Sequence, residues 1–197
     1  MRCRRILLLA IACILGALAL AQSQPLIVER HGDYLHVAAP QLHFISGKAL
    51  ERLHNGSSVI YVLTLRAVME HAGKPAFEIR ERFVVSYDLW EEKYSVVQTG
   101  PDGRATSRLT AVMAEAWCLE NMPMPVRAVP EGQPFMIRLE CSIDESEEAS
   151  GDKSDSGLTL AGLIDVFSRK RSEAPLRWNA AAGPMRLGDL KNIKQAR

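Results

Sequence analysis

Residues that could serve nucleophilic catalysis or phosphate binding lack the spacing that such chemistry requires. Serine hydrolases of the α/β type carry the nucleophile in a Gly-x-Ser-x-Gly turn, a pattern that this sequence lacks; Gly47 and Gly56-Ser57-Ser58 lie in predicted turns instead. Neither Gly-x-Gly-x-x-Gly nor a Walker phosphate loop occurs. The sequence therefore predicts no catalytic residue, no cofactor-binding residue and no cofactor.

The five histidines and the cysteines are the candidate metal ligands of this sequence. No two histidines have the His-x-x-x-His or His-Glu-x-x-His spacing that places ligands on one helix face. The two cysteines outside the N-terminal segment lie far apart in sequence. We expect surface and turn histidines and no metal site; the histidines are His31, His36, His43, His54 and His71.

Carboxylates and arginines form the remaining charged patterns. Glu91-Glu92 and Glu147-Glu148 are sequence neighbours, whereas glycoside hydrolysis needs two carboxyl groups that face each other across a cleft. On the predicted strands, basic and acidic residues share the outward faces. We interpret them as a ladder of cross-strand salt bridges and not as a ligand site; its members are Arg66, Arg80, Arg82, Arg138, Glu70, Glu78 and Glu140.

The N-terminus has the three parts of a secretory signal peptide. Three arginines precede an uncharged apolar run, Ile6 to Leu20, and Ala19-Leu20-Ala21 supplies small residues at the cleavage site. We expect residues 1–21 to be a signal peptide cleaved near Ala21, which exports the protein to the periplasm or the extracellular space. An uncleaved anchor is the alternative, although a spanning helix needs about 20 apolar residues. A lipoprotein modified at Cys13 is the third reading.

Charge divides the rest of the chain into three regions. Residues 22–143 carry 12 basic and 14 acidic residues, residues 144–157 carry six acids and one lysine, and residues 158–197 carry eight basic and three acidic residues. We expect an α+β domain over 22–143, an acidic, Ser-rich linker or loop over 144–157, and a basic C-terminal extension over 158–197. Trp178 and Leu187 could dock this extension on the core. The whole-chain charge of +1 gives no case for nucleic-acid binding.

Hydrophobic periodicity predicts the elements that must position these residues. Alternating apolar residues indicate strands over 34–38, 59–69, 77–87, 93–99 and 135–143, and helical spacing indicates helices over 46–56 and 107–121. The fold class is therefore α+β: an antiparallel β-meander of four to five strands with two helices packed on one face. Cys118 and Cys141 face the predicted core, and we favour two buried thiols over a disulfide.

Several of these segments resemble a bacterial exported family, domain of unknown function 4390. The resemblance covers the hairpin Arg80–Tyr87 with Lys93–Val96, the helix Arg108–Trp117 and the strand Phe135–Ile143, in matching order. It extends over about residues 33–143 and ends before the acidic stretch. It implies an exported α+β domain without an assigned biochemical activity.

Together these patterns favour an exported envelope protein without a catalytic site, which binds another envelope protein or an envelope component. Two alternatives belong to other classes. One is a hydrolytic enzyme whose site residues are dispersed in sequence. The other is a membrane-surface binder, in which Arg169, Lys170 and Arg171 make weak contact with anionic headgroups. The same basic residues could instead neutralise the acidic stretch that precedes them.

Overall fold

The computed structural model of the 197-residue chain describes residues 24–69, 74–101, 103–144 and 176–191. The predicted signal peptide, the acidic stretch beyond Asp144, and Arg169, Lys170 and Arg171 all lie outside these ranges. Among the residues that the structure describes, no helix has the length and apolar character needed to cross a membrane.

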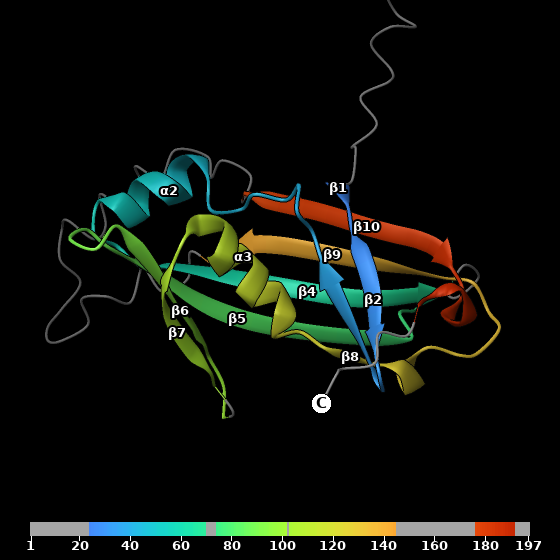
Figure 1. The fold of residues 1–197 in the computed structure, drawn as a ribbon. Helices are drawn as coiled ribbons and strands as arrows, with labels where there is room; N and C mark the ends of the chain where they lie inside the picture. Colours follow the sequence, from blue (N-terminus) through green and yellow to red (C-terminus); the bar gives the residue numbers. More distant parts are fainter. Residues whose placement is uncertain (1–23, 70–73, 102, 145–175, 192–197) are drawn as a thin grey trace, which may run out of the picture.

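The fold is α+β, as predicted, but its main sheet is larger than the expected meander of four to five strands. Seven strands form one mixed sheet (Figure 1). In spatial order they are β1 (Gln24–Pro25), β10 (Arg177–Met185), β9 (Phe135–Ile143), β4 (Val59–Met69), β5 (Phe77–Asp88), β6 (Lys93–Gln98) and β7 (Ala105–Leu109). The short β1 runs parallel to β10, and every other neighbouring pair is antiparallel.

Strand β4 occupies the middle of this sheet because it is apolar on both sides. Its first residues, Val59 to Leu65, are buried almost without interruption, whereas β5 and β9 alternate between buried and more exposed positions. Period-two alternation is typical of a strand with one face on the core and one face toward solvent. The central strands thus follow the sequence prediction closely.

A second, three-stranded sheet and two α-helices cover one face of the main sheet (Figure 1). The second sheet contains β2 (Ile27–His31), β3 (Tyr34–Ala38) and β8 (Met124–Pro125), and the helices are α2 (Gly47–His54) and α3 (Ala111–Glu120). Two 3-10 turns complete the described elements, at Val126–Ala128 and Leu187–Asp189.

Helix α3 begins later than the sequence pattern predicts. The predicted helix starts at Ser107, but Ala105–Leu109 forms the edge strand β7, and the Thr110 side chain then caps α3 by accepting a hydrogen bond from the backbone N–H of Met113. An N-cap hydroxyl satisfies one of the first free N–H groups of a helix. The cap, and not the apolar spacing of Leu109, sets the start of this helix.

The main sheet also continues past Ile143. Strand β10 comes from the region that we expected to be a C-terminal extension, and it pairs with β9 along its length. Trp178 packs against Phe44 and Tyr61, with ring centroids 6.5 and 6.4 Å apart, and Leu187 is buried. The sheet of the domain predicted over residues 22–143 therefore also includes Arg177–Met185. Trp178 and Leu187 reach the core, as expected.

Cys118 of α3 and Cys141 of β9 are both buried free thiols. Burial raises the pKa of both thiols above the usual range. They pack between α3 and the main sheet as small apolar groups, in agreement with the expectation of two thiols.

Candidate binding surface on the open face of the sheet

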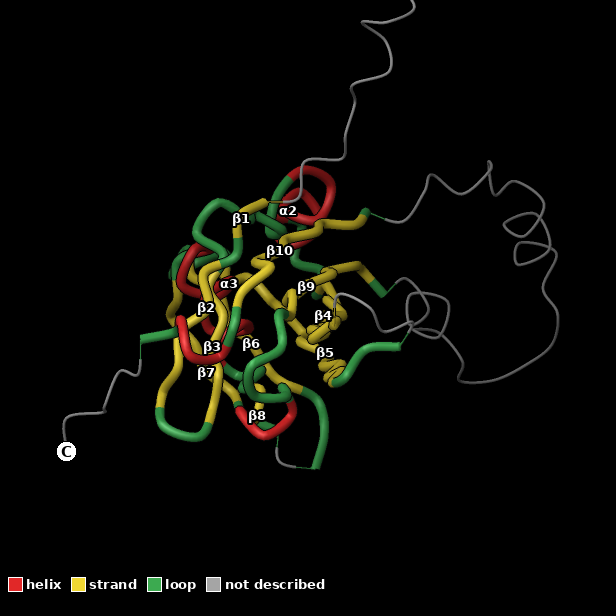
Figure 2. The backbone as a smooth tube through the Cα atoms, turned by 90° about the vertical axis from the view of Figure 1, so that its right-hand side faces the viewer, coloured by secondary structure: helices red, strands yellow, loops and turns green. Residues whose placement is uncertain are grey.

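The two faces of the main sheet differ in what covers them. The helices and the second sheet lie on one side (Figure 2), and no described helix or strand covers the other. We call this second side the arginine face, because five arginines project from it. They are Arg66 of β4, Arg80 and Arg82 of β5, Arg138 of β9 and Arg177 of β10.

Strand register brings these arginines together from distant parts of the sequence. Arg66 lies opposite Glu78 on one side and opposite Arg138 on the other. Thr64 lies between Arg80 and Glu140 in the next row. Residues directly opposite each other in a sheet have Cβ atoms about 5 Å apart, so charged side chains in these rows are within reach of one another.

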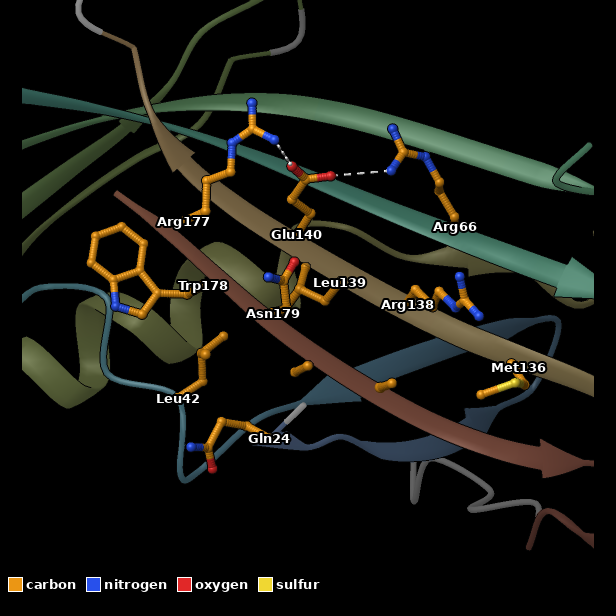
Figure 3. A pocket seen from close by; sticks show the side chains of 12 residues that line it. Gln24, Leu42, Arg66, Met136, Arg138, Leu139, Glu140, Arg177, Trp178 and Asn179 are labelled. Carbon is orange, nitrogen blue, oxygen red and sulfur yellow. Dashed lines mark hydrogen bonds and ion pairs between the residues drawn. The ribbon is translucent and has the colours of Figure 1, made fainter. Parts of the chain in front are cut away.

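Glu140 is the centre of the resulting ion-pair ladder. Its carboxylate accepts a hydrogen bond from Arg66 Nη1 at 3.2 Å and lies 3.5 Å from Arg177 Nη1 (Figure 3). Arg66 also donates from Nε to Glu78 at 2.7 Å. The bond to Glu78, together with the bond to Glu140, raises the pKa of Arg66 further above its usual value. Arg82 closes the ladder with Asp144, at 3.1 Å.

A hollow of about 640 Å³ lies along this ladder, over β9 and β10. We call it the arginine hollow. Three arginines and one glutamate line it, with partly exposed Met136 and Ala181 on the same face. Trp178 also lines the hollow, but from the core side of β10. The charged lining consists of Arg66, Arg138, Arg177 and Glu140. The hollow thus combines apolar contact area with an excess of two positive charges.

Of the three arginines that line the hollow, Arg138 is the one outside the ion-pair ladder of the described residues. It is exposed, and in Figure 3 its guanidinium points away from Glu140 and toward Met136. Within the described part of the chain it takes part in none of the ladder's ion pairs. An exposed guanidinium beside apolar area can bind a carboxylate in a bidentate manner.

The sequence anticipated part of this surface. The predicted salt ladder is confirmed for Arg66, Glu78 and Glu140, whereas Glu70 lies outside the described residues. Sequence reasoning named Trp178 as a docking residue but missed the strand that carries it with Arg177 and Asn179, because Arg177–Met185 contains three alanines and no β-branched residue. The only signal for this strand was the alternation of Trp178, Ala180 and Ala182 with polar or small neighbours.

A second cluster joins α3 to the segment before α2. The Glu115 carboxylate is 7% exposed and accepts a hydrogen bond from the backbone N–H of Ile45 at 2.8 Å; its other oxygen lies 3.1 Å from Nδ1 of His43. A buried carboxylate is stable only when it is hydrogen-bonded. An apolar groove of about 170 Å³ lies beside it. We interpret His43 and Glu115 as a structural pair that connects the two segments, and not as a catalytic pair. The Ser46 hydroxyl donates to the backbone carbonyl of His43, and within the described residues no nucleophile contacts the imidazole.

The other histidines make local contacts. The His31 and His36 rings lie 5.0 Å apart, and His54 contacts Tyr87 and Tyr94. His71 lies outside the described residues. In the described ranges, no three histidine, cysteine or acidic side chains are grouped so that they could hold a metal ion.

No protein-family model, curated protein or solved structure matches this chain. The resemblance to domain of unknown function 4390 therefore stays a prediction, and the case for function depends on the surfaces described above.

Proposed function

We propose that this protein is a binding domain of the cell envelope without a catalytic step, and that the arginine hollow binds an acidic segment of another protein that also carries an apolar side chain. The observation that carries the proposal is the composition of the hollow: three arginines against one glutamate, around partly exposed apolar residues. Export to the envelope is the sequence expectation on which the location depends.

The charge balance of the face favours an anionic partner. Glu140 is shared between Arg66 and Arg177, so one carboxylate serves two guanidinium groups. A partner carboxylate that binds Arg138 would therefore not have to displace an existing ion pair. The apolar residues beside it favour a partner that buries a side chain as well, because area removed from water adds affinity that charge alone does not supply.

A random copolymer of glutamate and tyrosine is a suitable probe, because it offers carboxylates and aromatic rings without a defined fold. We expect it to bind the mature chain in low salt and to bind more weakly as salt screens the arginines. Arg138→Glu should weaken this binding at least about tenfold, since it replaces an attraction by a repulsion.

The matched control is Arg127→Glu, which makes the same charge change at an exposed position of the 3-10 turn Val126–Ala128, away from the hollow. It should leave the affinity within about twofold of the wild-type value. Equal weakening by both substitutions, or no binding of the copolymer at all, would contradict the proposal.

A further inference from the structure

The turn between β5 and β6 presents two large apolar side chains to solvent. Trp90 is 96% exposed and Leu89 is 57% exposed. We call residues 88–93 the hairpin tip. Tryptophan is usually well buried and is the residue type most enriched among the anchors of protein interfaces, so a tryptophan that is almost fully exposed needs an explanation.

Hydrogen bonds within the tip and from a neighbouring strand restrain its conformation. The Asp88 carboxylate accepts the backbone N–H groups of Trp90 and Glu91 at 2.8 and 3.0 Å. Arg108 of β7 donates to both oxygens of Glu91 at 3.2 and 3.1 Å. Below the turn, the rings of Tyr87 and Tyr94 lie 4.8 Å apart. An anchor fixed in advance loses less conformational entropy when it binds.

The backbone is strained at the same place. Among the described residues, two that are not glycine have positive φ angles: Glu92 at 54° and Arg108 at 61°. Glu92 belongs to the tip, and Arg108 is the residue that clamps Glu91. Such conformations cost free energy and are retained where they position a functional group. Both residues lie beside Leu89 and Trp90: Glu92 in the same turn, and Arg108 through its hydrogen bonds to Glu91.

The charges around the two apolar residues define the surface that would accept them. Asp88, Glu91 and Glu92 are exposed or partly exposed carboxylates within the tip. Lys93 and Arg108 offset two of the three, so the tip is apolar at its apex and slightly acidic at its base. The complementary surface is an apolar hollow with a basic rim. An anionic lipid surface is disfavoured, because it would repel the carboxylates beside the apex.

Within the described residues, the arginine hollow is such a surface, but the tip of the same copy cannot fill it. The tip projects from β5 and β6, whereas the hollow lies over β9 and β10, on the other side of β4 in the sheet order. We propose that the hairpin tip of one copy binds the arginine hollow of a second copy. This inference rests on the proposed function, since it names the partner of the same hollow. A contact between two different patches is heterologous, so it produces closed rings or open chains of subunits.

The test uses two variants of the mature chain, each with one defective surface. Trp90→Ala removes the apex of the tip and keeps the hollow, and Arg138→Glu reverses a charge at the hollow and keeps the tip. Sedimentation velocity from low micromolar to several hundred micromolar should show wild-type protein assembling with concentration and each variant remaining monomeric. An equimolar mixture of the variants should form a one-to-one dimer and nothing larger, because only one intact tip and one intact hollow can meet.

Tyr34→Ala and Arg127→Glu are the matched controls, since they change another exposed aromatic residue and another exposed arginine; both should assemble like wild type. Wild-type protein that stays monomeric throughout, or a variant mixture that forms no dimer, would overturn the inference. The Glu–Tyr copolymer separates the two claims: if it binds Trp90→Ala while wild-type protein stays monomeric, the hollow binds acidic partners but a second copy is not one of them. Sedimentation with phosphatidylethanolamine–phosphatidylglycerol vesicles that depends on Trp90 would also overturn it.

Discussion

At the scale of single residues, burial decides which charged group supports the fold. Glu115 is buried and satisfies both a backbone N–H and His43, whereas Arg66 is partly exposed and its ion pairs are screened by water. Hydrogen bonds to a buried charge contribute about 1.5–3 kcal/mol, and exposed ion pairs contribute about 0–1 kcal/mol. The carboxylate that stabilises the fold is thus the one that the sequence did not single out.

Glu115→Ala should therefore lower the free energy of unfolding by about 2 kcal/mol or more, because it leaves the N–H of Ile45 buried without a partner. Arg66→Met should lower it by less than about 1 kcal/mol. Urea unfolding measures both, with Glu120→Ala as the control at an exposed position of the same helix. A larger loss for Arg66→Met than for Glu115→Ala would refute this ranking.

His36 makes stability depend on pH on the acid side. Burial, and then the neighbouring His31, lower its pKa below the ordinary value of 6.5, while Glu120 and Glu29 oppose the shift. The unfolded chain therefore binds a proton at a higher pH than the folded protein does. The contribution of His36 to stability is complete above its ordinary pKa and is lost as the pH falls through its folded-state pKa.

Urea unfolding of the wild-type protein should give a lower free energy of unfolding at about pH 5 than at about pH 7.5. We expect this difference to be smaller in His36→Gln. His31→Gln should have a smaller effect of the same sign, because it removes only the neighbouring charge. An acid-side loss that is unchanged in His36→Gln would show that other groups cause it.

At the scale of elements, the sequence predicted the strands whose own apolar residues form a clear pattern. It missed the strand that forms only through pairing with a neighbour. The alternation of Phe135–Ile143 and the apolar run of Val59–Met69 identified β9 and β4, because their burial follows directly from side-chain type. Strand β10 is rich in alanine and forms because β9 offers it an unpaired edge. For the same reason, the arginine hollow could be predicted only on its β4 and β9 side.

Strand β10 should hold the C-terminal piece of the chain in place after a break in the backbone. A specific protease site inserted between Ser150 and Gly151 would divide the mature chain into 22–150 and 151–197. We expect the two pieces to co-elute in native size-exclusion chromatography and to separate in urea, because β10 is paired with β9 and β1 and Ala180 and Leu187 are buried. A C-terminal piece that elutes alone under native conditions would refute the docking of β10.

At the scale of the whole molecule, the two faces of the main sheet differ in what they present. Its covered face contains the core, with Tyr61, Phe83 and Phe135 fully buried. Its open face carries the five arginines, and Val62 and Thr64 of β4 are buried on that face although no described helix or strand lies above them. This separation of the core from the open face agrees with our proposal of a binding domain.

The most direct test of the central claim is to map where an acidic, aromatic partner binds. A short glutamate–tyrosine peptide titrated into isotope-labelled Trp90→Ala protein would report this through NMR chemical shifts, free of any self-association. We predict that the largest shifts fall on Arg66, Arg138 and Arg177, including the Nε–H groups of their side chains. Shifts centred on His43 and Glu115, or no shift at peptide concentrations up to the millimolar range, would contradict the claim that the arginine hollow is the binding site.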